Sequence, residues 1–140
     1  MMELIKLDEG YFVTSQITID TLDPLKKEGF DIIINNRPDN EEEAQPLSLE
    51  LSVAAKKLGL TYVYNPVNLS SLSEKEIKQQ NNALKSAKKV LAFCRTGTRS
   101  SVLWVLNSQD TKGISPLLAE LKQKGFDIER CLPAMTPFIK

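Results

Sequence analysis

The segment from Cys94 to Arg99 contains the residue types that could carry out covalent chemistry. Cys94 ends a short apolar run, a glycine follows at position 97, and Arg99 precedes a long apolar stretch. A cysteine thiolate is a strong nucleophile, and an arginine guanidinium can bind two oxygens of a tetrahedral oxyanion at once. The spacing therefore predicts a cysteine nucleophile beside an oxyanion site, with Cys94 and Arg99 as the catalytic pair.

The loop between these two residues is predicted to supply further contacts to the anion. A glycine-containing loop that leads into a helix can direct several backbone N–H groups inward, and the helix N-terminus adds positive potential. Together with the arginine, these groups should stabilise the thiolate without any histidine. We also expect the Ser100 hydroxyl to donate a hydrogen bond to the sulfur when the sulfur is the leaving group. The residues expected to bind the substrate are Arg95, Thr96, Gly97, Thr98 and Ser100.

The composition excludes several other kinds of site. The chain of 140 residues has no histidine, which excludes Ser-His-Asp catalysis, Cys-His catalysis and His-ligated zinc. Two cysteines are too few for a structural zinc site, so we expect no metal and no cofactor. Eighteen basic residues balance eighteen acidic ones, which disfavours broad binding to nucleic acid or to a membrane surface. The expected partner is a small oxyanion or a phosphorylated substrate.

The chain shows no targeting or membrane-spanning signal. No apolar stretch approaches the length that crosses a bilayer, and the opening residues lack the basic and apolar regions of a signal peptide. We therefore expect a cytoplasmic protein with free thiols, because disulfides are rare in that compartment. Cys131 is interpreted as an ordinary, partly buried residue near the end of the chain.

Alternating strands and helices are predicted to position the cysteine loop. Short apolar runs predict strands at 4–7, 11–13, 30–35, 60–64 and 90–93. Amphipathic segments predict helices at about 18–27, 47–58, 73–87, after residue 99, and 115–124. Ser73 and Glu76 form a capping box that marks the start of the third helix. The alternation favours one α/β domain over residues 1–140, with a mainly parallel sheet of four to five strands and helices on both faces.

The loop Cys94-Arg-Thr-Gly-Thr-Arg99-Ser resembles the active-site loop of the beta-lactamase hydrolase-like, phosphatase-like family. The segment 34–41, Ile-Asn-Asn-Arg-Pro-Asp-Asn-Glu, is similar to the strand-to-loop signature of that family, and Gly-Phe-Asp at 125–127 is a third match. The resemblance covers nearly the whole chain and implies the protein tyrosine phosphatase fold. It also implies that Cys94 is the nucleophile and that Arg99 is its arginine.

The strand-to-loop signature suggests additional pocket residues. Arg37 and Asp39 match it and are therefore predicted neighbours of the pocket, although Pro38 and Asp39 could equally form a local turn. The acidic run 40–43, Asn-Glu-Glu-Glu, is interpreted as a solvated loop.

The sequence departs from typical tyrosine phosphatases in three ways. Four residues instead of five separate Cys94 from Arg99, and Phe93 stands where a histidine is usual. Asn68 lies in the stretch expected to carry the general-acid aspartate, and an amide cannot donate the proton that helps to expel the leaving group. We still predict Asn68 as a neighbour of the pocket, with Asp39 or Glu74 as candidate replacements for the acid.

Three functions therefore remain open from the sequence. The first is a phosphatase-like hydrolase that forms a cysteinyl-phosphate. The second is a rhodanese-type sulfurtransferase, which uses the same four-residue spacing, forms a persulfide on Cys94 and needs no general acid. The third is a non-catalytic module that kept the oxyanion site and lost the acid.

Overall fold

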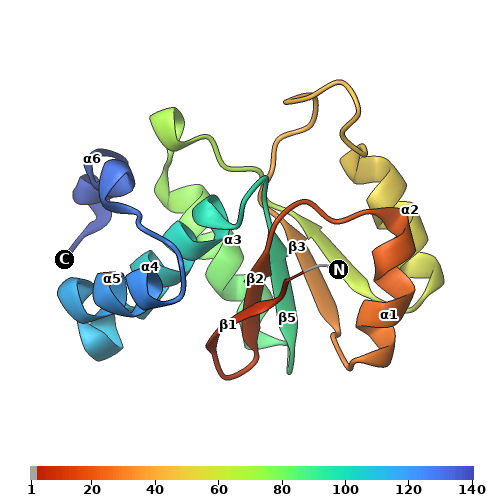
Figure 1. Ribbon diagram of the computed structural model, residues 1–140, viewed down its shortest axis with the longest axis horizontal. Helices are drawn as coiled ribbons and strands as arrows, with labels where there is room; N and C mark the ends of the chain where they lie inside the picture. Colours follow the sequence, from red (N-terminus) through yellow and green to blue (C-terminus); the bar gives the residue numbers. More distant parts are fainter. Residues whose placement is uncertain (1–2) are drawn as a thin grey trace.

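The sheet at the centre of the protein has five short strands in the order β1-β2-β5-β3-β4 (Figure 1). In this computed structural model, residues 3–140 are described, and Met1 and Met2, with which the predicted domain begins, lie outside the described residues. β1 and β2 pair antiparallel, and the other neighbouring strands pair parallel, which confirms the predicted mainly parallel α/β sheet. The strands are β1 (Ile5–Asp8), β2 (Tyr11–Thr14), β3 (Ile32–Asn35), β4 (Thr61–Tyr64) and β5 (Val90–Phe93).

The two central strands form because their apolar side chains are buried on both faces. All four residues of β3 and all four of β5 are buried. Successive side chains of a strand point to opposite faces. Ile32 and Ile34 therefore pack into one hydrophobic cluster, while Ile33 packs into the other. Such continuous apolar runs are typical of parallel strands that are covered on both sides.

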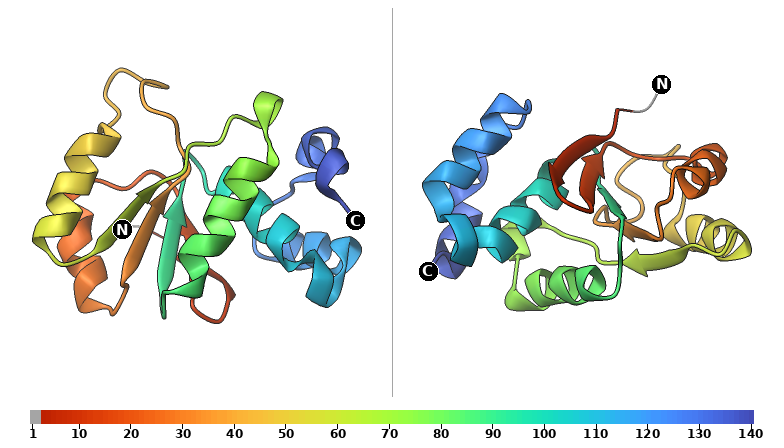
Figure 2. Two further views of the ribbon diagram at one scale, coloured as in Figure 1. Left: turned by 180° about the vertical axis from the view of Figure 1, so that it is seen from behind. Right: turned by 90° about the horizontal axis from the view of Figure 1, so that it is seen from below.

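Helices cover both faces of the sheet, as predicted (Figure 2). On one side α1 and α2 pack against the cluster that contains Ile33. On the other side α3 and α4 pack against the cluster that contains Ile32, and α5 lies against α4. The helices are α1 (Leu22–Lys27), α2 (Ser48–Lys57), α3 (Glu74–Lys85), α4 (Thr98–Lys112), α5 (Ile114–Gln123) and α6 (Leu132–Met135). Short 3-10 turns occupy Ile19–Thr21, Leu69–Ser71, Glu129–Cys131 and Thr136–Phe138.

Local signals set the helix boundaries. The Glu76 carboxylate accepts hydrogen bonds from the Ser73 backbone N–H at 3.2 Å and from its hydroxyl at 2.6 Å, so the predicted capping box is present. The end of the chain differs from the prediction. Residues 129–138 form successive helical turns, and Cys131 is fully buried among apolar side chains instead of partly buried. Both cysteines are free thiols.

The parallel strands bring distant segments to one edge of the sheet. β3 pairs with β5 in register from Ile32 to Asn35, so the residues that follow these strands emerge side by side. Cys94 directly follows β5, and Asn36 and Arg37 directly follow β3. The carboxyl ends of parallel strands are where ligands bind in open α/β sheets.

No helix among residues 3–140 is both long and apolar enough to cross a membrane.

Candidate active site

Cys94 lies at the bottom of the loop between β5 and α4, with only 1% of its surface exposed. The Gly97 backbone N–H points at the Cys94 Sγ, with the nitrogen 3.1 Å from the sulfur. Gly97 has φ of +94°, and a Cβ at this position would lie 3.0 Å from the Phe126 ring. Only glycine combines this backbone conformation with this close contact. The loop therefore curls around the sulfur, with α4 beginning immediately afterwards at Thr98.

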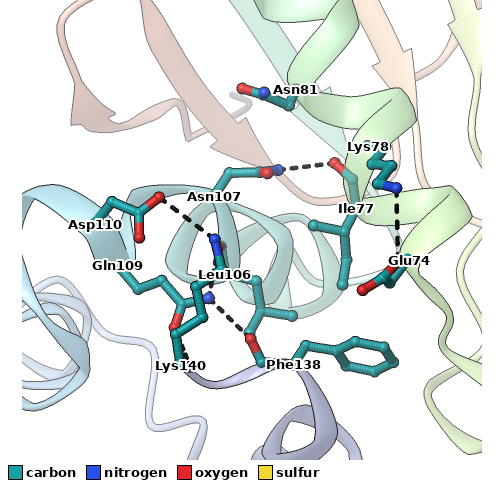
Figure 3. Close-up of a pocket in the computed structure, with 10 residues that line it drawn as sticks. All are labelled: Glu74, Ile77, Lys78, Asn81, Leu106, Asn107, Gln109, Asp110, Phe138 and Lys140. Carbon is teal, nitrogen blue, oxygen red and sulfur yellow. Dashed lines mark hydrogen bonds and ion pairs between the residues drawn. The ribbon is translucent and has the colours of Figure 1, made fainter.

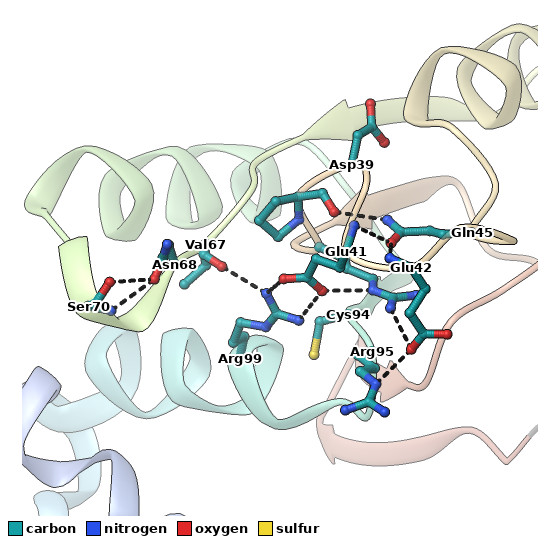
Figure 4. Close-up of polar contacts among 12 residues, drawn as sticks. Asp39, Glu41, Glu42, Gln45, Val67, Asn68, Ser70, Cys94, Arg95 and Arg99 are labelled. Atoms are coloured by element: carbon teal, nitrogen blue, oxygen red, sulfur yellow. Dashed lines mark hydrogen bonds and ion pairs between the residues drawn. The ribbon is translucent and has the colours of Figure 1, made fainter.

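Arg99 lies in the first turn of α4 and is held by residues from two other loops (Figure 4). Its Nη1 donates to Glu41 Oε2 at 2.7 Å and to the Val67 carbonyl at 3.0 Å, and its Nη2 donates to Glu41 Oε1 at 2.8 Å. The hydrogen bonds with Glu41 and the nearby Cys94 sulfur raise the pKa of Arg99 above its ordinary value. The guanidinium is therefore a fixed positive charge next to the thiol.

Arg37, which the resemblance suggested as a neighbour of the pocket, joins this cluster from the end of β3. Only 3% of its side chain is exposed. Its Nε donates to Glu41 Oε1 at 2.8 Å, its Nη1 to Gln16 at 3.0 Å, and its Nη2 to Glu42 at 3.1 Å. Hydrogen bonds from Arg99 and then from Arg37 lower the pKa of Glu41 to about 2. Glu41 is therefore ionised at any ordinary pH.

The acidic run that follows β3 is exposed, as the interpretation of a solvated loop expects, but two of its members are also held in ion pairs. Glu41 binds both Arg37 and Arg99, while Glu42 binds Arg37 and also accepts from Arg95 Nε at 3.0 Å. Arg37 is close in the sequence, but Arg95 and Arg99 are more than 50 residues away, so no local pattern indicates their pairing with this loop. An open pocket at this edge is lined by Arg37, Glu41, Glu42, Arg95 and Arg99.

The remaining residues of the cysteine loop have different surroundings. The Thr96 and Thr98 hydroxyls are 2.9 Å apart at the surface, and the Arg95 side chain is 65% exposed at the rim. Ser100 is fully buried, and its hydroxyl donates to Asn36 Oδ1 at 2.9 Å. The hydroxyl proton is therefore directed to Asn36, so the expected hydrogen bond from Ser100 to the Cys94 sulfur is not formed in this structure.

A buried polar network under the loop was not found by sequence reasoning. Asn36 Nδ2 donates to Gln80 Oε1 at 2.9 Å, and Gln80 Nε2 donates to Tyr11 Oη at 3.1 Å. The Tyr11 hydroxyl in turn donates to the Ser100 carbonyl at 3.0 Å. Burial raises the pKa of Tyr11, so the hydroxyl keeps the proton that it donates. The network links the start of α4 to β2, α3 and the end of β3.

Two predicted pocket neighbours make local contacts instead. Asp39 Oδ1 accepts from the Ser48 backbone N–H at 2.8 Å at the start of α2, and its carboxylate points away from Cys94 and Arg99 in Figure 4. Asn68 Oδ1 accepts from the backbone N–H and the hydroxyl of Ser70. The structure thus brings Arg37 to Cys94 and Arg99, but it brings neither the Asp39 nor the Asn68 side chain there.

A second pocket lies between α3, α4 and the last residues of the chain (Figure 3). Of the site residues considered from the sequence, it contains only Glu74, the other candidate replacement for the acid, which pairs with Lys78 at 3.6 Å. Asn107 Nδ2 donates to the Ile77 carbonyl at 3.0 Å, and Gln109 Nε2 donates to the Phe138 carbonyl at 2.9 Å. These polar groups therefore connect α4 to its neighbours.

The sequence is similar to a family of phosphatase-like domains. The family model described as the beta-lactamase hydrolase-like protein, phosphatase-like domain, matches residues 3–111. The beta-lactamase hydrolase-like protein of Xylella fastidiosa is 32% identical over 107 residues, which cover 76% of this chain and 25% of the relative. That of Agrobacterium fabrum is 33% identical over 106 residues, which cover 75% and 25%. The chain thus spans about a quarter of the length of these curated relatives.

Solved structures agree with this placement. A presumed phosphatase from Neisseria meningitidis is 28% identical, with a TM-score of 0.79 over 93% of this chain and 96% of that protein. Tk-PTP in its active form is 18% identical, with a TM-score of 0.74 over 96% and 95%, and it shows the fold alone. TpbA from P. aeruginosa, solved with phosphotyrosine, is 11% identical, with a TM-score of 0.57 over 95% and 71%. The chain belongs to the family of beta-lactamase hydrolase-like, phosphatase-like domains and has the protein tyrosine phosphatase fold.

Proposed function

We propose that this protein is a cysteine-dependent phosphatase-like hydrolase that acts on a phosphate ester through a cysteinyl-phosphate at Cys94. The observation that carries the proposal is the fixed Arg99 guanidinium beside the buried Cys94 sulfur, which also receives the Gly97 N–H. These groups form the nucleophile and the oxyanion contacts that phosphoryl transfer requires. Membership in the phosphatase-like family supports the same reaction class.

The reaction would take place in two displacements. The Cys94 thiolate attacks phosphorus, so an S–P bond forms while the P–O bond to the alcohol or phenol breaks. Arg99 and the loop amides bind the non-bridging oxygens, where negative charge accumulates. A water molecule then attacks phosphorus, the S–P bond breaks, and inorganic phosphate leaves with the thiolate restored. Each step returns its electron pair to the departing atom, so no external oxidant or reductant is needed.

Among residues 3–140, none of the candidate acids is placed to protonate the leaving oxygen, and Glu74 lines the other pocket, where it pairs with Lys78. Glu41 contacts Arg99, but with a pKa of about 2 it is ionised and cannot donate a proton near neutral pH. Asp39 binds the start of α2, and Asn68 is an amide. We therefore expect aryl phosphates, whose leaving groups need little protonation, to react much faster than alkyl phosphates.

The test compares two substrates on one protein. Purified protein is offered an aryl phosphate in one reaction and thiosulfate with cyanide in another, alongside the Cys94→Ser and Cys131→Ser variants. We expect release of phenol without thiocyanate, lost in Cys94→Ser and retained in Cys131→Ser. Thiocyanate alone would replace the proposal with sulfur transfer. If neither product forms but inorganic phosphate still raises the melting temperature, the protein is a non-catalytic oxyanion-binding module.

A further inference from the structure

We propose that Glu41 is a positioning residue that fixes the Arg99 guanidinium so that one of its edges faces the substrate oxyanion. The inference rests on the proposed function, because it assigns the contact through which that site orients its arginine. Glu41 is in the loop after β3, 58 residues before Arg99 in the sequence. It touches the arginine and no reacting atom.

The hydrogen bonds of Arg99 show which edge remains available. A guanidinium has five N–H donors in one plane. Glu41 takes one donor from each Nη atom in a two-pronged contact, and the Val67 carbonyl takes the other donor of Nη1. Within residues 3–140, the Nε and the second donor of Nη2 have no oxygen acceptor, and the Cys94 sulfur is the side-chain atom that interacts with the guanidinium besides Glu41. These two N–H groups lie on a shared edge and point in parallel, an arrangement that matches two oxygens of a phosphate.

The Cys94 sulfur and Glu41 lie on different sides of the guanidinium (Figure 4). The sulfur is close enough to contribute to the raised pKa of Arg99. A phosphoryl group attached to Cys94 would therefore meet the Nε–Nη2 edge, while Glu41 continues to occupy the adjacent Nη1–Nη2 edge. On this geometry the carboxylate and the substrate bind different donors and do not compete.

Arg37 makes the Glu41 position rigid. The Arg37 side chain is almost completely buried, and its Nε donates to Glu41 Oε1 at 2.8 Å. The Arg37 backbone N–H donates to Asn35 Oδ1 at 2.8 Å, and its Nη1 donates to Gln16. Arg37, which follows β3, therefore holds Glu41 in place, and Glu41 in turn holds Arg99.

The opposite role for Glu41 would be that of a plug that fills the oxyanion site. A plug competes with the substrate, so its removal would tighten anion binding. A positioning residue holds the arginine in place, so its removal loosens the guanidinium and weakens binding. The two roles therefore predict changes of opposite sign in one measurement.

The experiment compares Glu41→Gln with Glu43→Gln, a matched control in the same acidic run. Glu43 is exposed and forms no ion pair with the described residues. We measure the dissociation constant for orthovanadate by calorimetry, and kcat and KM for an aryl phosphate. For Glu41→Gln we expect kcat to fall by roughly 10- to 100-fold and the dissociation constant to rise about tenfold, because small misplacements of an orienting group cost this much. Glu43→Gln should match the wild type.

A second variant separates charge from geometry. Glu41→Asp keeps the negative charge but is too short to reach both Nη atoms, so we expect an intermediate loss, with thermal unfolding used to verify that each variant is folded. Tighter orthovanadate binding or an unchanged kcat in a folded Glu41→Gln variant would overturn the inference while leaving the proposed hydrolase intact. Weaker binding in a protein that hydrolyses no phosphate ester would support the inference and refute the hydrolase. A wild type that neither binds orthovanadate nor hydrolyses the ester would overturn both.

Discussion

Two loops meet at the candidate active site, and they are held in place by different forces. The loop between β5 and α4 is fixed by its own backbone, with the Gly97 N–H on the Cys94 sulfur and a buried strand and a helix on either side. The loop between β3 and α2 is fixed by side-chain charges, chiefly Glu41 and its two arginines. Local chain geometry therefore places the nucleophile, whereas ion pairs from a distant segment place the arginine.

The largest effect is expected from changing the arginine on which both loops converge. Arg99→Lys keeps the positive charge but loses the planar fork, so it can no longer bind Glu41 and two substrate oxygens together. We expect kcat/KM for an aryl phosphate to fall by about 10²- to 10³-fold, as for the loss of an oxyanion donor. Arg130 is exposed, so Arg130→Lys is the control, and its kcat/KM should equal that of the wild type. Full activity in Arg99→Lys would remove Arg99 from the oxyanion site.

The loop between β5 and α4, which is fixed by its own backbone, should be disrupted by a substitution of Gly97. Gly97→Ala imposes a side chain at φ of +94° and places a Cβ 3.0 Å from the Phe126 ring, whereas Gly125→Ala has φ of +100° with no atom within 4 Å. Both substitutions place a Cβ in the left-handed conformation, which should lower the free energy of unfolding by about 1–2 kcal/mol. Gly97→Ala should lose about 1 kcal/mol more through overpacking, along with most of its turnover. Denaturant unfolding and steady-state kinetics measure these effects, and equal losses in both would refute the role of the Phe126 contact.

The ion pairs that fix the loop between β3 and α2 should make the free energy of unfolding depend on pH in a defined direction. Because Arg99 and Arg37 depress the pKa of Glu41 to about 2, its ion pairs stabilise the fold fully above the ordinary value of 4.5. That stabilisation declines as the pH falls from 4.5 toward 2. We therefore expect the difference in unfolding free energy between the wild type and Glu41→Gln to be constant from pH 8 to 5 and to shrink at pH 3. A difference that grows on acidification would contradict this assignment.

The smallest effect is expected at Asp39, which is in the same loop but is directed away from Cys94 and Arg99. Asp39→Ala removes the acceptor for the Ser48 N–H at the start of α2. This should cost about 1 kcal/mol of the free energy of unfolding, as for the loss of a helix cap, with kcat within about twofold of the wild type. Loss of turnover in a well-folded Asp39→Ala variant would instead identify Asp39 as the missing acid.

The same two loops show what could be predicted from the sequence. The strand, cysteine, glycine and arginine of the first loop are contiguous, so local patterning was enough to place Cys94 and Arg99 at a strand end before a helix. The β3 strand was equally clear from its buried isoleucines. The pairing of Glu41 with Arg99 depends on β3 lying next to β5 in the sheet. That strand order leaves no local signal, although Arg37 and Glu41 four residues apart after a strand could have indicated an ordered loop.

The buried network of Asn36, Gln80 and Tyr11 was missed for the same reason. Each residue is unremarkable within its own element, and only the packing of α3 against the strand ends brings their polar groups together. A polar residue on a helix is ordinarily expected to face the solvent. Gln80 is fully buried because its amide has partners in Tyr11 of β2 and in Asn36 and Asn65, which directly follow β3 and β4.

The most direct test of the central claim is to look for the covalent intermediate itself. Protein is mixed with an aryl phosphate, quenched in acid within the first turnover, and measured by intact-mass and peptide spectrometry. We expect one phosphoryl group on the peptide that contains Cys94, and none when Cys94→Ser is treated in the same way. Turnover of the ester with no phosphoryl group on Cys94, or with the label on another residue, would contradict it.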